Sequence, residues 1–133
     1  MDLARQPLLH DLVVTLHAPA AALSAPSAQI SAGGVQGVFV GDVRVVSRAE
    51  VRVDGELPEP ISGGTLGAGR AMFVGLTRSL GDSGADPTVR LERERLARPD
   101  GAAEELRLVS TASVPVETEI RLSVEVDLAA IEW

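Results

Sequence analysis

Apolar and polar residues alternate along the C-terminal part of the chain more regularly than anywhere else. Over residues 116–128 every second residue is apolar or threonine, and the residues between them are Glu, Arg, Ser or Asp. A helix would scatter those polar side chains around its axis, whereas a strand places all of them on one face. The pattern therefore predicts a long antiparallel strand, with its Val/Ile/Leu face buried and its charged face in water.

Two hairpins are predicted by the turn residues between other apolar runs. Residues 38–40 and 43–46 are short β-type runs on either side of Gly41-Asp42, a pair of residues that favours a tight two-residue turn. Residues 89–96 and 106–112 form a second pair, joined through the sequence Arg98-Pro99-Asp100-Gly101. Both pairs predict neighbouring antiparallel strands.

The second hairpin contains a conflict in its pattern. Val89 and Leu91 share a strand face with Arg93 and Arg95, so this face changes from apolar to charged midway. Two explanations are open at this point. Either the strand runs out beyond the core, or a β-bulge switches its faces.

Turn residues divide the remaining chain into short segments. Residues 8–16 predict a strand, and the Ala/Pro/Ser-rich residues 18–28 predict an irregular linker with room for one short strand. Asp54-Gly55 predicts a turn that leads the preceding strand into another hairpin. Residues 57–69 and 81–87 are predicted loops, whereas residues 70–80 fit either a strand or a helix. Together these segments predict one all-β domain over residues 1–133, an antiparallel, supersandwich-like β-sandwich.

Composition and charge narrow the classes of function. The 133 residues include no cysteine and no lysine, and aromatic residues make up 2%. A formal net charge of −7 argues against binding to nucleic acid or to an anionic membrane surface. No stretch approaches the roughly 18 apolar residues of a membrane span, and no signal peptide is visible. We therefore expect a cytoplasmic protein.

Candidate catalytic or metal-binding residues do not form a recognisable pattern. His10, Asp11 and His17 could be considered as zinc ligands. His10 and Asp11 would point to opposite faces of a strand, however, which does not favour a shared zinc site. The glycine-rich residues 63–69 lack the Lys-Ser/Thr of a phosphate-binding loop. No pair of acidic residues stands out as the two facing carboxylates of a glycosidase. We assign no catalytic residue, metal ligand or cofactor to this chain.

The first hairpin carries a resemblance to a known family. Gly37-Val38-Phe39, Asp42-Val43-Arg44 and Val46-Ser47-Arg48 are similar to the "GLF…DTR…LS" signature in the N-terminal domain of amylo-alpha-1,6-glucosidase-type glycogen debranching enzymes. Residues 5–11, 80–82 and 86–90 resemble segments of actinobacterial members, and residues 127–132 resemble the family's "DFADLFEVRG" segment.

The resemblance implies a non-catalytic accessory β-sandwich. Such a domain packs on a helical-barrel domain that carries the catalytic carboxylates, and it shapes one wall of the alpha-glucan cleft. The residues that would contact the catalytic domain or its substrate lie in and beside the first hairpin: Phe39, Asp42, Arg44, Ser47 and Arg48.

Two other functions are open, a self-standing carbohydrate-binding module and a protein-interaction sandwich. The first usually presents an aromatic platform, yet this chain has no tyrosine, and its aromatic residues are Phe39, Phe73 and Trp133. A small hydrolase would need a pocket with converging carboxylates. Because the resemblance places the last residues inside a family motif, we expect the family's domain to continue beyond Trp133. We also expect the isolated chain to form a homodimer through an open sheet edge or an uncovered apolar face.

Overall fold

A computed structural model describes residues 11–31 and 34–130, and every regular element of three residues or more in them is a strand. The all-β prediction is confirmed. The strands, in chain order, are β1 (Val13–His17), β2 (Ala20–Ser24), β3 (Gly37–Val40), β4 (Val43–Val46), β5 (Arg48–Val53), β6 (Glu59–Thr65), β7 (Arg70–Leu76), β8 (Val89–Arg98), β9 (Gly101–Ser110) and β10 (Ile120–Glu125).

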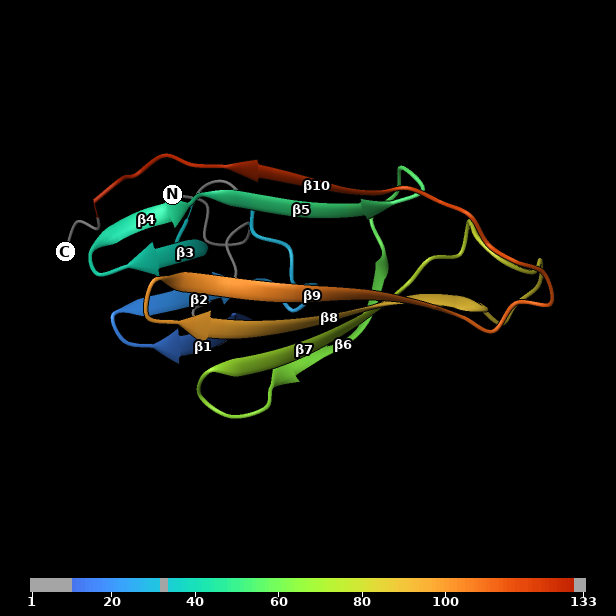
Figure 1. Ribbon diagram of the computed structural model, residues 1–133, viewed down its shortest axis with the longest axis horizontal. Coiled ribbons are helices and arrows are strands. Elements are labelled where there is room, and N and C mark those ends of the chain that lie inside the picture. The colour runs from blue at the N-terminus through green and yellow to red at the C-terminus, as the bar shows by residue number, and fades with distance from the viewer. Residues whose placement is uncertain (1–10, 32–33, 131–133) are drawn as a thin grey trace.

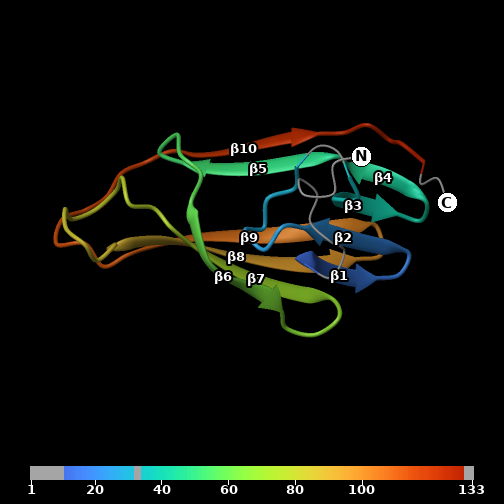
Figure 2. The same ribbon diagram turned by 180° about the vertical axis from the view of Figure 1, so that it is seen from behind.

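The strands form two packed layers, as the prediction of an antiparallel sandwich requires. One layer is the sheet β6-β7-β8-β9, and the sheet β1-β2-β3-β4 packs against it. Figure 1 shows β8 and β9 in front of β1 and β2, and Figure 2 shows the same layers from behind. All strand pairs are antiparallel.

The third sheet, β10-β5, continues the layer of β1 to β4. β4 and β5 follow one another in the chain with only Ser47 between them. β10 pairs with β5, and the chain after β10 continues beside β4. There the Arg44 N–H donates to the Ala129 carbonyl oxygen at 2.9 Å. The C-terminal segment thus joins the two sheets along one edge.

The core between the layers is built from small aliphatic side chains. Ala22, Ile30, Val38 and Ala49 form one buried cluster, and a second consists of Val51, Val53 and Leu91. A third contains Val13, Ala28, Ala71 and Phe73, and Phe73 is its one aromatic side chain. The low aromatic content of the chain is therefore visible in the core itself.

Both predicted hairpins are present. β3 pairs with β4 around Gly41, whose φ of +60° is the left-handed conformation that glycine adopts readily. β8 pairs with β9 in an unbroken register that ends at Arg98 opposite Gly101, so Pro99-Asp100 form the two-residue turn.

Two segments that the sequence predicted to be irregular contain strands. The linker at residues 18–28 includes β2, which forms a hairpin with β1 and also pairs with β3. The predicted loop at residues 57–69 contains β6, so that prediction was wrong. Glycine and proline are tolerated there because β6 is the edge strand of its sheet. Gly63 is needed for packing, because a Cβ atom at this position would lie 2.3 Å from the carbonyl oxygen of Pro26.

The Asp54-Gly55 turn is present, but it does not lead into a hairpin. A single bridge joins Val53 to Glu56, after which the chain leaves for the other layer. The partner of β5 is β10, distant in sequence. The sequence of residues 70–80 fitted either a strand or a helix, and in the structure residues 70–76 form strand β7. Residues 81–87 form no strand, as predicted.

β10 is shorter than the alternating pattern suggested, and its apolar face is not buried. The strand covers Ile120–Glu125, and all of its residues are exposed. Leu122 is 54% exposed and Val124 is 49% exposed. The prediction of a buried Val/Ile/Leu face was therefore wrong, because none of the described strands of the opposite layer covers these side chains.

Candidate functional site

The five candidate contact residues lie together along β3, β4 and the start of β5, but their environments differ. Phe39 is half-buried in β3 opposite Arg44. Asp42 is exposed at the turn, and within the described part of the chain its carboxylate has no hydrogen-bond or ion-pair partner. Of the five side chains, the Asp42 carboxylate is the polar group most available to another molecule.

Arg44 is held within the domain. Its Nε lies 3.2 Å from Asp127 Oδ1 and its Nη2 lies 2.5 Å from Asp127 Oδ2, a two-point contact with the segment that follows β10. The aliphatic part of Arg44 packs beside Gly37, where a Cβ atom would lie 2.7 Å from Arg44 Cδ. The glycine and the arginine of the resembling motifs are therefore linked by direct packing.

Ser47 and Arg48 occupy the junction of β4 and β5. Ser47 is buried, and its backbone N–H donates to the Glu125 carbonyl oxygen at 2.8 Å. Arg48 donates to Glu50 at 2.7 Å and lies 3.4 Å from a Glu125 carboxylate oxygen. Both residues connect the start of β5 to β10. The sequence therefore grouped the exposed carboxylate of Asp42 with residues that make contacts within the domain.

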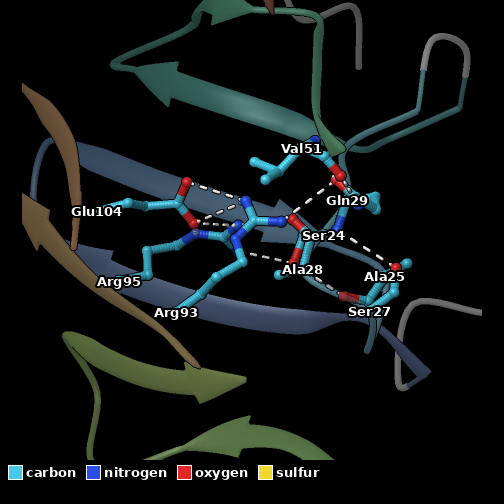
Figure 3. Close-up of polar contacts among 9 residues, drawn as sticks. All are labelled: Ser24, Ala25, Ser27, Ala28, Gln29, Val51, Arg93, Arg95 and Glu104. Atoms are coloured by element: carbon cyan, nitrogen blue, oxygen red, sulfur yellow. Dashed lines mark hydrogen bonds and ion pairs between the residues drawn. The ribbon is translucent and has the colours of Figure 1, made fainter. Parts of the chain in front are cut away.

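A second polar cluster, which the sequence reasoning did not find, lies inside the sandwich (Figure 3). Arg93 and Arg95 of β8 are 3% and 2% exposed, although β8 neither leaves the core nor contains a bulge. Both explanations proposed for the mixed face were therefore wrong. Glu104 of β9 accepts hydrogen bonds from both guanidinium groups, at 3.0 Å from Arg93 and 2.9 Å from Arg95. The sequence contained a sign of this pair, because a two-residue turn at Pro99-Asp100 places Arg95 directly opposite Glu104.

The cluster connects the two layers. Arg95 donates to Ser24 Oγ at 2.7 Å and to the Ala28 carbonyl oxygen at 2.8 Å. Arg93 donates to Gln29, whose amide also pairs with the backbone N–H and carbonyl of Val51. Burial lowers the pKa of Arg95, and the negative charge of Glu104 opposes this effect. Two buried guanidinium groups thus share one carboxylate, that of Glu104, whose side chain is 23% exposed.

A comparison with family models identifies the chain. Residues 16–132 match the model described as the N-terminal domain of some glycogen debranching enzymes. The chain belongs to this family. No curated protein and no solved structure matches it. The predicted resemblance to the N-terminal domain of glycogen debranching enzymes is confirmed, and the family match extends over almost all of the described residues.

Two acidic residues of this debranching-enzyme domain line a small cavity. A cavity of about 150 Å³ lies beside the segments that follow β5 and β7, with Glu56 and Glu59 in its wall. Pockets for small-molecule ligands usually measure about 300–1,000 Å³. A hydrogen bond from Arg78 at 2.6 Å lowers the pKa of Glu59, the opposite of what a general acid requires.

Within residues 11–31 and 34–130, no three His, Asp or Glu side chains gather as a metal site. No helix there is long and apolar enough to cross a membrane. His17 lies at the exposed end of β1, and His10 is outside the described residues.

The Arg44–Asp127 contact makes the attachment of the C-terminal segment dependent on pH. The hydrogen bond from Arg44, helped by the Ala129 N–H, lowers the pKa of Asp127 below its ordinary value of 3.8. Because this pKa is lowered, the stabilisation by the Arg44–Asp127 contact is complete above about pH 4. It is lost as the pH falls through the pKa of Asp127 in the folded state. We expect the Asp127 carboxyl ¹³C shift to titrate at higher pH in Arg44→Ala than in the wild type. Identical midpoints would contradict a role for Arg44.

Proposed function

We propose that this domain is a non-catalytic accessory domain of an amylo-alpha-1,6-glucosidase-type debranching enzyme. It packs on the helical-barrel catalytic domain of that enzyme and forms one wall of the alpha-glucan cleft. The observation that carries the proposal is the family match over residues 16–132. We place the parent enzyme in the cytoplasm, a reducing compartment with which the absence of cysteine is compatible.

The contact edge in this proposal is the β3–β4 hairpin, and Asp42 is its contact residue. The Asp42 carboxylate is exposed at the turn and can accept hydrogen bonds from a sugar hydroxyl or from a basic side chain. Arg44 takes a positioning role, because its contact with Asp127 fixes the base of the same hairpin. Arg48 fixes the adjacent edge through Glu50 and Glu125.

The position of the C-terminal segment supports this choice of edge. Val43, which follows Asp42, pairs with Ala130 through an isolated bridge. Figure 1 shows the described end of the chain running beside β4 and the β3–β4 turn. The hairpin and this segment therefore form one continuous edge, which a partner domain can contact along both.

Replacing Asp42 by alanine in the parent enzyme should lower kcat/KM on a branched glucan about tenfold or more. Hydrogen bonds to charged groups contribute roughly 1.5–3 kcal/mol, so the loss of one such contact is measurable in initial rates. The fold of this domain should be unaffected, because Asp42 has no partner within the described residues.

The matched control is Asp86→Ala. Asp86 is also exposed, in the segment between β7 and β8. Figure 1 shows this segment at the end of the sandwich opposite to the β3–β4 turn. Its replacement should leave kcat/KM unchanged. If both variants retained wild-type kinetics, the hairpin would be an ordinary surface turn and the proposed contact edge would be wrong.

The alternative of a self-standing sugar-binding module gains no support from the described aromatic residues. Phe73 is 2% exposed and Phe39 is half-buried in β3. Stacking on a sugar ring requires an accessible aromatic face, which neither residue offers. A protein-interaction role is favoured by one specific observation, the uncovered apolar face of β10.

A further inference from the structure

The turns of the hairpins β1–β2, β3–β4, β6–β7 and β8–β9 all lie at one end of the sandwich (Figures 1 and 2). The β3–β4 turn is fixed to the β1–β2 turn, because the Gly41 N–H donates to the Pro19 carbonyl oxygen at 2.8 Å. Asp42, the proposed contact residue, follows Gly41 directly. It therefore belongs to a surface that is wider than its own hairpin.

The β6–β7 turn, residues 66–69, joins the two layers at the same end. Leu16, near the end of β1, donates its N–H to the Ala68 carbonyl oxygen at 2.7 Å. Ala97, near the end of β8, donates its N–H to the Gly69 carbonyl oxygen at 2.8 Å. These backbone hydrogen bonds connect the hairpin turns into one surface. We call it the turn platform, and it consists of residues 16–20, 41–42, 66–69 and 96–98.

Three exposed leucines of the turn platform surround the β6–β7 turn. Leu66 lies in the turn, and Leu16 is held beside it by the hydrogen bond to Ala68. Leu96 is paired with Arg70, the first residue after the turn. The exposed fractions are 53% for Leu16, 56% for Leu66 and 39% for Leu96. Apolar side chains that come from separate hairpins and meet at the surface are typical of an interaction site.

Arg98 adds a free positive charge to the platform. It is exposed at the end of β8, and its guanidinium group has no hydrogen-bond or ion-pair partner in the part of the chain that the structure describes. Leu96 and Arg98 are two residues apart in a strand without a bulge, so their side chains lie on the same face. The other arginines in residues 34–130 all form ion pairs within the domain: Arg44, Arg48, Arg52, Arg70, Arg78, Arg90, Arg93, Arg95, Arg107 and Arg121.

We infer that the turn platform docks on the catalytic domain of the parent enzyme, which presents a carboxylate to Arg98 beside apolar side chains that cover the three leucines. This docking rests on the proposed function, since Asp42 of the same platform is the contact residue there. A guanidinium group that is covered by apolar surface requires a charged partner, and a carboxylate matches its two parallel N–H groups. A neutral glucan offers no such group. Arginine beside apolar side chains is also the composition that protein interfaces favour.

The test follows the alkylation of an introduced cysteine, because this chain has none of its own. Leu66→Cys is made in the 133-residue chain and in the parent enzyme, and both are treated with iodoacetamide. Mass spectrometry of the peptide that contains residue 66 gives the labelling rate. The rate should be about tenfold or more lower in the parent enzyme, because surrounding contacts exclude water from the centre of an interface.

Val114→Cys is the matched control for the labelling. Val114 is 60% exposed and lies in the segment between β9 and β10. Figure 1 shows this segment at the end of the sandwich opposite to the hairpin turns. The labelling rate of Val114→Cys should therefore be the same in the 133-residue chain and in the parent enzyme.

The role of Arg98 is tested by reversing its charge in the parent enzyme that carries Leu66→Cys. Arg98→Glu should return the labelling rate to that of the 133-residue chain, because two carboxylates would then face each other in the interface. Arg121→Glu makes the same change of charge at a side chain of β10 that is 70% exposed. It should leave the labelling rate unchanged.

Three results would overturn the inference. One is equal labelling of Leu66→Cys in the two proteins; a loss of activity in Asp42→Ala would then confine the contact to the β3–β4 hairpin. The second is protection that Arg98→Glu does not remove. The third is protection in the 133-residue chain itself, which would assign the platform to glucan if a maltooligosaccharide causes it, or to a second copy if it disappears on dilution. Wild-type kinetics in Asp42→Ala would instead overturn the proposed contact of that residue, without changing the labelling expected here.

Discussion

Replacing Glu104 by glutamine should lower the free energy of unfolding by about 3–5 kcal/mol, because it leaves two buried guanidinium groups without a counter-charge. Glu104 is the carboxylate shared by Arg93 and Arg95, whose side chains are 4% and 2% exposed. Glutamine has nearly the same size, so the change removes charge without opening a cavity. Chemical denaturation measures the effect as a shift of the unfolding midpoint.

Glu105→Gln is the matched control for this change. Glu105 is the next residue of the same strand, but its side chain is 69% exposed and its partner Arg107 lies 3.3 Å away at the surface. A surface replacement of this kind should cost no more than about 0.5 kcal/mol. A combined Arg93→Met, Arg95→Met and Glu104→Leu variant should recover most of the loss, because no buried charge remains. Equal denaturation midpoints for the two single glutamine variants would contradict a special role for Glu104.

Phe73→Ala should lower the free energy of unfolding by about 3–5 kcal/mol, the usual cost of truncating a buried phenylalanine. Phe73 is 2% exposed in a cluster whose other members are Val13, Ala28 and Ala71, and these small side chains cannot fill the space. The guanidinium carbon of Arg95 also lies 4.8 Å from the centre of the ring, so the alanine variant loses a cation–π contact as well.

Phe73→Leu separates the two contributions. Leucine keeps most of the buried volume but lacks the ring, so the loss should be about 1–2 kcal/mol. Phe39→Ala serves as the control at a half-buried position and should cost less than Phe73→Ala. If the Phe39 and Phe73 alanine variants were equally destabilised, the layer interface around Phe73 would not be the well-packed core that we describe.

Local features of the sequence were sufficient for the parts of the fold that depend on local geometry. Gly41-Asp42 and Pro99-Asp100 each predicted a tight turn, and both turns are present. The short β-type runs beside them predicted strands for the same reason, since turn chemistry fixes the pairing of adjacent segments. The family motifs along residues 37–48 led to an identification that the family match confirms.

Pairing between distant segments could not be predicted in this way. The turn at Asp54-Gly55 is real, yet β5 takes its partner from residues 120–125. The glycine-rich segment around Gly63 becomes strand β6 because it pairs with β7, and Gly63 leaves room for the Pro26 backbone. No local pattern contains the information that these segments meet. Among the candidate contact residues, the sequence likewise could not show that Arg44 is held by Asp127 and that the Asp42 carboxylate is free of such contacts.

The sequence by itself determined an all-β sandwich with its hairpins, and membership of the debranching-enzyme family. The tertiary structure alone decided which side of each strand became core. Arg93 and Arg95 are buried because Glu104 of the neighbouring strand supplies a carboxylate to both guanidinium groups. The opposite layer adds acceptors, Ser24 and the Ala28 carbonyl for Arg95 and Gln29 for Arg93. Leu122 and Val124 are exposed because the opposite layer ends at β9. Burial depends on what lies across the interface, and that is a property of the assembled layers.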